Sequence, residues 1–366
     1  MEKSRLITEE LVKKIVRPRE AHLHKGDCGR VLIGAGSVGM AGAAILASRG
    51  ALRSGAGLVR AAVPSELTTI LQVAVPEATC IDRGSLLADV ESADLAQYNA
   101  ICIGPGLGEE AESIAFVKAM LTSYGGVLIV DADALNIIAH NDMLGDLRAR
   151  AEHFPDTTVV TPHIGEARRL LAAAAQASDR NKFENTKAGT GFAAVSAADS
   201  ESYGLQDGKP AALTAAASET RDAAATASAA RSFDFSGAAS ETARLDIAAA
   251  LVEATRAIVV LKGSGTIVAA AGREPLVNTT GNPGMATGGS GDVLAGVITG
   301  LAGQRRQPGT ELAATAFRIG AYDAAVAGVY IHGLAGDLAA ADLGEYGLIS
   351  GDLPLYVAKA IKRITE

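Results

Sequence analysis

Residues 100–133 hold a complete strand–helix–strand unit, and this unit decides the fold class. It begins with Ala100-Ile-Cys-Ile-Gly-Pro-Gly-Leu-Gly108 and ends with Val127-Leu-Ile-Val-Asp-Ala-Asp133. The first four residues of each run are all apolar, which is typical of strands that are buried on both faces of a sheet. The stretch between them, Glu109–Leu121, has the period of a helix. Two buried strands joined by a helix predict parallel neighbours in an α/β sheet.

The same alternation continues on both sides of this unit. Short β-branched runs predict further strands, and the alanine- and leucine-rich stretches between them predict helices. The predicted strands are Arg30–Ile33, Gly57–Val63, Thr158–Thr161 and Ile258–Leu261, and the predicted helices include Ala41–Arg53 and Glu166–Ala174. We expect a β-hairpin from Thr266 to Asn278 and mostly helix after Gly291. The sequence therefore predicts one α/β domain with a doubly wound, mainly parallel sheet and helices on both faces.

Length and composition limit the classes of function. A chain of 366 residues, 48% of them apolar, is large enough for an α/β domain with a buried core. The net charge of −8 argues against nucleic acid or an anionic membrane as the main partner. The sequence has no long uninterrupted apolar run and no secretory signal pattern, and its three scattered cysteines favour unpaired thiols in a reducing compartment. We therefore expect a cytoplasmic protein with no nucleic-acid or membrane partner.

One segment, from about residue 175 to 240, differs from the rest in composition. It is rich in alanine and serine and has few large apolar residues. Such a segment buries too little apolar surface to offset the entropy of ordering it. We interpret it as a flexible or loosely helical insertion, with a small functional lid as the alternative. Regular helix is expected to resume over Glu241–Ala257.

The strongest sign of chemistry is Gly281-Asn-Pro-Gly-Met-Ala-Thr-Gly-Gly-Ser-Gly-Asp-Val293. Its glycines allow a tight turn with exposed N–H groups, and the apolar run Val293–Leu301 predicts a helix directly after it. Free N–H groups at a helix N-terminus bind phosphate. Asp292, on the first helical turn, can take a proton from a hydroxyl group while the amides stabilise a transferring phosphoryl group. The alternative is that Asp292 only caps the helix.

Two other strand ends bring polar residues to the same edge of the sheet. Lys262-Gly-Ser-Gly-Thr266 follows one predicted strand, and Pro162-His-Ile-Gly-Glu166 follows another. Open α/β sheets bind ligands at the carboxyl ends of their strands. Lys262 is therefore a candidate ligand of a phosphate, and Glu166 a candidate ligand of magnesium, directly or through water.

A competing motif, Gly34-Ala-Gly36-Ser-Val-Gly39, matches the dinucleotide-binding fingerprint in its letters and in its place between a strand and a helix. That fingerprint also requires an acidic residue at the end of the following strand. Here the strand Gly57–Val63 ends in Pro64-Ser65. We therefore expect a ligand-contact turn at Gly34–Gly39 and keep a nicotinamide-dependent oxidoreductase only as a lesser alternative.

Together these motifs resemble those of the ADP/ATP-dependent NAD(P)H-hydrate dehydratase family, within the ribokinase-like superfamily. The resemblance covers roughly residues 22–174 and 255–360. Its motifs are His24-Lys-Gly-Asp-Cys-Gly-Arg30, Gly42-Ala-Ala44, Arg53-Ser-Gly-Ala-Gly57, Ile103-Gly-Pro-Gly-Leu107, Asp131-Ala-Asp-Ala-Leu135, Thr161-Pro-His-Ile-Gly-Glu166, Lys262-Gly-Ser-Gly-Thr266 and Gly281–Asp292. It implies an N-terminal helical extension over 1–21 and a dehydratase domain over 22–366, without the N-terminal epimerase domain that the family often carries.

The resemblance implies a lyase that restores NADH or NADPH from the (S)-hydrated form while hydrolysing ADP or ATP. Asp292 would deprotonate the hydroxyl group of the hydrated ring, which attacks the terminal phosphoryl group. The family motifs place the hydrated dinucleotide at Ala43, Gly106, His163 and Asp292, and the adenine nucleotide at Lys262, Gly263, Ser264, Gly265, Thr266 and Gly291. They imply Mg²⁺ at Glu166, and we expect a homo-oligomer.

Two departures and two alternatives accompany this resemblance. Cys28 stands where the family leads us to expect an aromatic residue, and Ser290 where we expect threonine. The main alternative is a ribokinase-like kinase for a vitamin precursor or a sugar, which shares the fold and the phosphorylation of a hydroxyl group. A non-catalytic nucleotide-binding protein is less favoured, because Asp292 is intact.

Overall fold

The computed structural model describes residues 5–19, 21–90, 94–189, 240–304 and 319–366. In this part of the chain the strands form one ten-stranded sheet with the order β1-β10-β9-β8-β7-β6-β5-β2-β3-β4. Neighbouring strands run parallel except at β8–β9 and β9–β10. The strands are β1 (Leu6–Ile7), β2 (Arg30–Gly34), β3 (Leu58–Val63), β4 (Thr79–Asp82), β5 (Ala100–Ile103), β6 (Val127–Val130), β7 (Thr158–Val160), β8 (Ile258–Leu261), β9 (Ile267–Ala269) and β10 (Leu276–Asn278).

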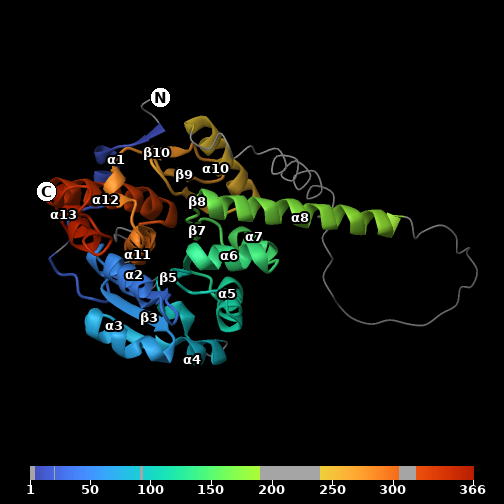
Figure 1. Ribbon diagram of the computed structural model, residues 1–366, viewed down its shortest axis with the longest axis horizontal. Coiled ribbons are helices and arrows are strands. Elements are labelled where there is room, and N and C mark those ends of the chain that lie inside the picture. The colour runs from blue at the N-terminus through green and yellow to red at the C-terminus, as the bar shows by residue number, and fades with distance from the viewer. Residues whose placement is uncertain (1–4, 20, 91–93, 190–239, 305–318) are drawn as a thin grey trace, which may run out of the picture.

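Helices cover both faces of this sheet (Figure 1). One face carries α1 (Glu9–Ile15), α2 (Ala41–Arg53), α3 (Thr68–Ala74), α11 (Ser290–Gly303), α12 (Ala321–Leu343) and α13 (Leu353–Thr365). The other carries α4 (Arg83–Ala88), α5 (Ala111–Ser123), α6 (Ala132–His140), α7 (Leu144–His153), α8 (Ile164–Gly189) and α10 (Glu241–Thr255). Successive strand residues point to opposite faces, so Val31 and Ile33 join one core while Leu32 joins the other. The sheet therefore lies between two separate apolar cores.

The predicted fold class is confirmed. Each of the six predicted strands is present with its ends within one residue, and the predicted hairpin is β9–β10. Two strands were not expected. The edge strand β4 reads Thr-Cys-Ile-Asp and is only partly buried, so it lacks the fully apolar pattern of the central strands, and β1 has only two residues.

The N-terminal segment differs from the helical extension that was expected over residues 1–21. It contains helix α1, but Leu6 also pairs with Val277 of β10, so the segment adds a parallel strand to the sheet. Val12 and Ile15 of α1 are buried in the core. Residues 5–19 are thus packed as part of the domain.

The segment of unusual composition lies partly on α8. This helix passes its expected end at Ala174 and continues to Gly189, and it extends away from the body of the fold (Figure 1). The alanines after Leu171 favour helix over other structures, which accounts for the extension. Residues 190–239 of the expected insertion lie outside the described residues.

Helix α12 is long and apolar enough to cross a membrane by length and composition alone. However, 78% of its most apolar window is buried inside the fold, as in the central helix of a globular domain.

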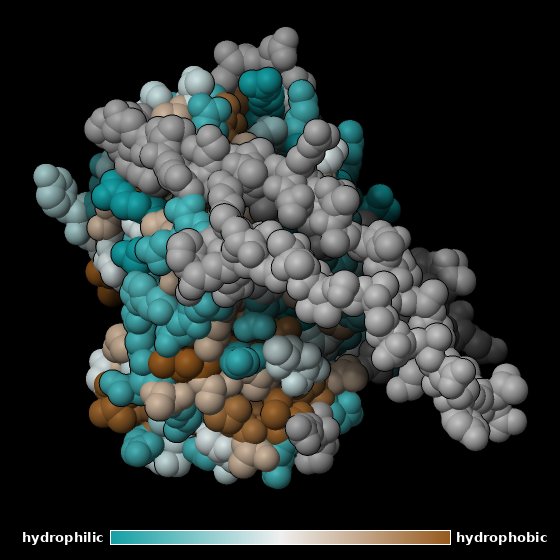
Figure 2. All heavy atoms as spheres, turned by 90° about the vertical axis from the view of Figure 1, so that its right-hand side faces the viewer, coloured by the Kyte–Doolittle hydropathy of each residue, from teal (hydrophilic) through white to brown (hydrophobic). Residues whose placement is uncertain are grey.

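The outer surface is mixed in character. On the side toward which α8 points, apolar residues gather low on the molecule, and the visible surface above them is mainly hydrophilic (Figure 2).

Glycines allow α2 and α11 to pack with their backbones in contact. A Cβ atom on Gly296 of α11 would lie 2.0 Å from the carbonyl oxygen of Ala47, and one on Gly50 of α2 would lie 2.6 Å from the carbonyl oxygen of Val293. Such distances leave no room for a side chain at either position. The close approach fixes where α11 begins, next to the carboxyl ends of the central strands.

We expect Gly296→Ala to lower the free energy of unfolding by about 1–3 kcal/mol, because the added methyl group forces α2 and α11 apart. Gly145→Ala is the matched control, since nothing lies within 4 Å of a Cβ atom at this exposed position of α7. The control should raise stability by about 0.5–1 kcal/mol, as alanine is the better helix former. Urea unfolding of both variants is the measurement, and equal midpoints would contradict the packing described here.

Candidate active site

The N-terminus of α11 has the form that the glycine-rich segment predicts. Gly289 precedes the helix with a φ of 92°, a left-handed conformation that favours glycine, and Asp292 stands in the first turn. Ser350, from the loop before α13, donates a hydrogen bond of 2.7 Å from its Oγ to the carbonyl oxygen of Gly288. The turn is thus held from the C-terminal part of the chain.

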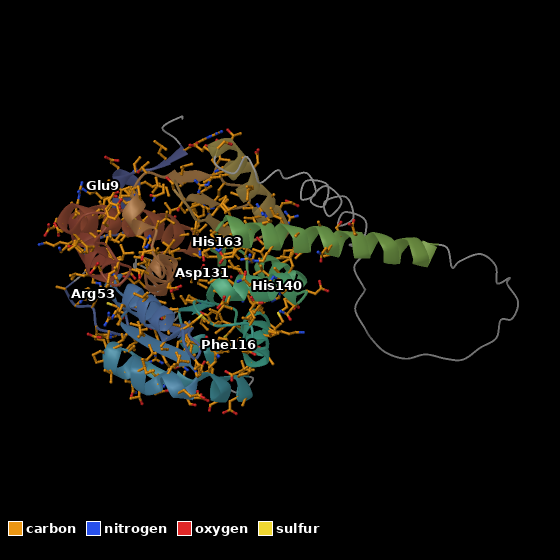
Figure 3. All side chains as sticks on the ribbon, in the orientation of Figure 1. Glu9, Arg53, Phe116, Asp131, His140 and His163 are labelled. Carbon is orange, nitrogen blue, oxygen red and sulfur yellow. The ribbon has the colours of Figure 1, made fainter. Side chains whose placement is uncertain are left out.

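Three charged side chains meet at this turn from neighbouring strand ends. The Nζ atom of Lys262, after β8, lies 2.5 Å from Oδ1 of Asp131, after β6, and 3.7 Å from Oε2 of Glu166. Asp131 lies near the centre of the molecule (Figure 3) and is 1% exposed. A Cβ atom on Gly291 would lie 3.4 Å from the same Nζ atom, so the ammonium group borders the start of α11.

Burial and neighbouring charges shift the pKa values of this cluster. Burial alone would lower the pKa of Lys262, but the negative charges of Asp131 and Glu166 outweigh it, and the pKa is raised. Burial raises the pKa of Glu166, opposed by the charge of Lys262. Burial, followed by the charge of Asp131, raises the pKa of Asp292 to about 7, against the opposing charge of Lys262. A carboxyl group with this pKa can accept and release a proton near neutral pH.

Glu166 is held in place by the turn that precedes it. The main-chain N–H of His163 donates to Oε2 of Glu166 at 2.7 Å, and the ring Nε2 of His163 lies 3.2 Å from Oε1. Glu166 is 4% exposed. Among the described residues, no group of three or more His, Cys, Asp or Glu side chains is arranged to hold a metal ion.

The predicted nucleotide contacts line one cavity of about 630 Å³. The turn Lys262–Thr266 and Gly291 form one part of its wall, together with His163. Val329 and His332 of α12 form another part. The structure therefore brings together all six residues that were expected to contact the adenine nucleotide.

The four residues that were predicted to contact the substrate do not all line this cavity. A Cβ atom on Gly106 would lie 2.7 Å from the Cβ atom of Ala43, so these two residues are in contact. The main-chain N–H of Gly36 donates to the carbonyl oxygen of Pro105 at 2.8 Å, which joins the two glycine turns. Of the four predicted substrate contacts, only His163 is among the residues that line the 630 Å³ cavity. Ala43, Gly106 and Asp292 are not.

Three residues near the site were given no role from the sequence. Asp131 follows a predicted strand and belongs to the motif Asp131–Leu135, but nothing in the sequence showed its contact with Lys262. His332 lies in the apolar sequence of α12, where burial lowers its pKa to about 4, and its Nε2 lies 3.4 Å from Oγ of Ser290. Ser350 belongs to no recognisable sequence motif.

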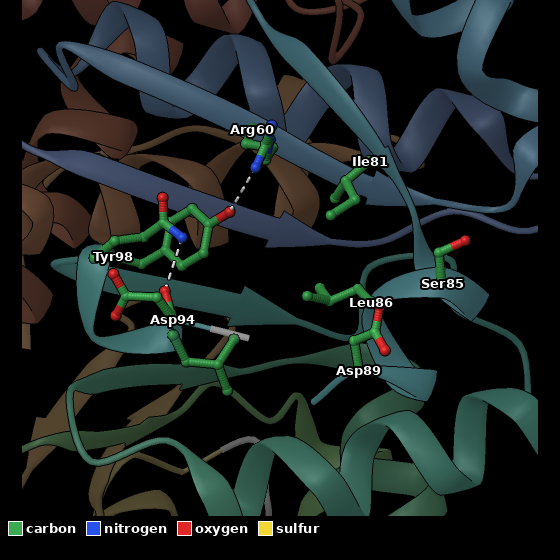
Figure 4. A pocket seen from close by; sticks show the side chains of 9 residues that line it. Arg60, Ile81, Ser85, Leu86, Asp89, Asp94 and Tyr98 are labelled. Carbon is green, nitrogen blue, oxygen red and sulfur yellow. Dashed lines mark hydrogen bonds between the residues drawn. The ribbon is translucent and has the colours of Figure 1, made fainter. Parts of the chain in front are cut away.

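A second cavity of about 330 Å³ lies between β3, α4 and the segment before β5 (Figure 4). In it, Nη1 of Arg60 lies 3.4 Å from the hydroxyl oxygen of Tyr98. None of the predicted site residues lines this cavity.

Comparison with known proteins identifies relatives of this chain. The family model described as NAD(P)H-hydrate dehydratase matches residues 31–193 and 225–363 and leaves out residues 194–224. A bifunctional NAD(P)H-hydrate repair enzyme of Moorella thermoacetica is 33% identical, over 99% of this chain and 54% of that protein. The Escherichia coli enzyme of the same description is 32% identical, over 92% of this chain and 48% of that protein. The chain thus spans about half the length of these curated relatives.

Solved structures share the fold. A ribokinase-like superfamily protein of Enterococcus faecalis is similar with a TM-score of 0.67 and 23% identity, over 99% of this chain and 96% of that one. An ADP/ATP-dependent NAD(P)H-hydrate dehydratase of Bacillus subtilis, crystallised with ATP and Mg²⁺, is similar with a TM-score of 0.66 and 24% identity, over the full length of both chains. With a family model that matches well over half of its residues, the chain belongs to the NAD(P)H-hydrate dehydratase family.

Proposed function

We propose that this protein dehydrates (S)-NAD(P)H-hydrate to NADH or NADPH in a reaction that consumes ADP or ATP. The observation that carries the proposal is the position of Asp292. Its carboxyl group has a pKa of about 7 and stands on the first turn of α11, and Gly291 beside it lines the cavity that holds the predicted nucleotide contacts. Membership of the dehydratase family supports the substrate.

Asp292 acts as the base in this proposal. Its carboxylate takes the proton from the ring hydroxyl group, whose oxygen attacks the terminal phosphorus of the nucleotide. The bond from that phosphorus to the bridging oxygen breaks, and the N–H groups at the start of α11 stabilise the charge on the transferred group. The ring nitrogen then assists the departure of phosphate, and loss of a proton from the neighbouring ring carbon re-forms the double bond.

The two ligands take different parts of the site. The adenine nucleotide binds in the 630 Å³ cavity at Lys262, Gly263, Ser264, Gly265, Thr266 and Gly291. The hydrated dinucleotide binds at Ala43 and Gly106, with its ring near Asp292 and His163. Two observations support this division: Ala43 and Gly106 are in contact with each other, and neither lines the 630 Å³ cavity.

Mg²⁺ fits this site as an ion bound to nucleotide phosphates. Glu166 is a buried carboxylate, and Oδ2 of Asp131 is buried without a hydrogen-bond partner, so oxygen donors are present. The described residues offer no set of three ligands, which agrees with the preference of Mg²⁺ for one or two carboxylates plus phosphates and water. Glu166 would hold the ion directly or through water, and the ion would neutralise phosphate charge.

We further propose a cytoplasmic location and a homo-oligomeric state. All three cysteines, Cys28, Cys80 and Cys102, are free, as expected in a reducing compartment. Large apolar side chains at Val73 and Ile349 are 79% and 60% exposed, and burial against another copy would remove them from water.

Incubation of the protein with hydrated NADH and ADP or ATP should produce the absorbance of reduced nicotinamide together with free phosphate. Asp292→Asn should lower this turnover by at least about a hundredfold, because the asparagine cannot accept the proton. Nucleotide binding should be retained, as measured by calorimetry. A phosphorylated product without free phosphate would support a kinase, and a variant of near-normal rate would remove Asp292 from proton transfer.

The rate should also report the pKa of Asp292. We expect kcat/KM for the hydrate to fall about tenfold for each pH unit below 7 and to level off above it, because only the carboxylate form acts as a base. Asp131→Asn should move the midpoint to lower pH, since the charge of Asp131 raises the pKa of Asp292. A midpoint at the same or a higher pH would contradict this coupling.

Ala43→Leu should raise the KM for the hydrate at least about tenfold, an effect of roughly 1.4 kcal/mol, because the larger side chain fills the space beside Gly106. Ala43→Ser is the control and should change it little. Calorimetry with ADP should give the same affinity for all three proteins. Loss of ADP binding in Ala43→Leu would show that the two ligands have been assigned to the wrong parts of the site.

A further inference from the structure

The nucleotide turn Lys262–Thr266 is held from behind by Arg244 of α10. The guanidinium group donates from Nη1 to the carbonyl oxygen of Ser264 and, in a longer contact of 3.4 Å, from Nη2 to that of Leu261. A Cβ atom on Gly263 would lie 3.1 Å from Nη2. Both acceptors are main-chain carbonyl oxygens, one on each side of Gly263.

This contact determines which way one peptide group faces. The peptide bonds of the described residues are all trans, so the N–H of Gly265 points opposite to the carbonyl oxygen of Ser264 and therefore away from Arg244. Gly265 has a φ of 63°, in the left-handed region. Among the described residues, no hydrogen-bond acceptor is recorded for its N–H, and the residue lines the nucleotide cavity.

Two other hydrogen bonds hold this turn, from Oγ1 of Thr266 to the carbonyl oxygen of Gly263 at 2.9 Å and from the N–H of Asn278 to the carbonyl oxygen of Thr266 at 2.8 Å, but neither involves the Ser264–Gly265 peptide group. Glycine adopts positive and negative φ with similar ease, so without Arg244 the Ser264–Gly265 peptide can rotate at small cost and turn its carbonyl oxygen toward the cavity. The neighbouring Leu261–Lys262 peptide is fixed at both ends, because the N–H of Lys262 also donates to the carbonyl oxygen of Pro162 at 2.8 Å. The Ser264–Gly265 peptide has Arg244 on its oxygen and no such second partner.

The start of α10 holds Arg244 in place. Ser240 caps the helix by accepting a hydrogen bond from the N–H of Ala243 at 3.2 Å, and the helix packs against β8 and β9, which flank the turn. Burial lowers the pKa of Arg244, and the charge of Glu241 opposes this shift. Arginine stays protonated in proteins, so all of its N–H donors remain available.

We propose that Arg244 is a positioning residue that keeps the Gly265 N–H directed into the nucleotide cavity and thereby sets the affinity for the adenine nucleotide. The inference rests on the proposed function for the identity of the ligand. It concerns the binding of the nucleotide and leaves the hydrate site and the base Asp292 unchanged.

The test is calorimetry of ADP and ATP binding to the full chain. Arg244→Met keeps an unbranched apolar stem but removes the hydrogen-bond donors, and it should weaken nucleotide binding by about tenfold or more, the usual effect of losing hydrogen bonds to a charged group. Arg244→Lys keeps the charge but cannot span two carbonyl oxygens, so it should recover only a small part of that loss. The KM for the hydrate and the pH midpoint should match those of the unaltered protein in both variants.

Arg148→Met is the matched control, since Arg148 lies on α7 and, among the described residues, forms an ion pair only with Glu152. It should bind nucleotide like the unaltered protein. Equal nucleotide affinity in Arg244→Met, or full recovery in Arg244→Lys, would overturn the positioning role while the proposed function stands. If the unaltered protein binds neither ADP nor ATP, the proposed function itself fails.

Discussion

The ammonium group of Lys262, whose side chain is only 17% exposed, organises the site and depends on most of the fold. Burying a charge is costly unless charged partners surround it, and here Asp131 and Glu166 supply them. These three residues follow β8, β6 and β7, which are neighbours in the sheet. The cluster therefore forms only when the three strands pair in their correct register. The charges of Asp131 and Glu166 also add to the effect of burial in raising the pKa of Asp292 to about 7, against the charge of Lys262.

The sequence predicts the central part of the sheet well because its pattern has a direct physical cause. Runs such as Val127–Val130 are apolar at every residue because both faces of the strand are covered by helices. Within the described part of the chain, the edge strand β4 pairs with β3 alone and is partly exposed, so its sequence needs no such run. The predicted end of α8 came too early because its later alanines favour helix but do not add large apolar residues at helical spacing, which is the pattern that predicts a helix.

For the site, the sequence identifies residues that belong to glycine turns and strand ends but not the contacts that support them. The turn Lys262–Thr266 and Asp292 stand out because glycine and carboxylate residues follow buried strands or precede a helix. Arg244 binds main-chain carbonyl oxygens, and Ser350 does the same. A main-chain acceptor exists at every residue, so neither partner leaves a pattern in the sequence. Such supporting contacts become visible only in three dimensions.

The hydrogen bond from Ser350 to Gly288 has a consequence for the order in which the protein matures during synthesis. Ser350 follows Gly288 by 62 residues, and β1 pairs with β10, which is made far later. Contacts between residues so distant in sequence form slowly and late. A nascent chain that has not yet reached Ser350 can build the sheet from β2 to β8 but cannot form the hydrogen bond that holds the turn at Gly288. The nascent protein therefore completes its glycine-rich turn later than its central sheet.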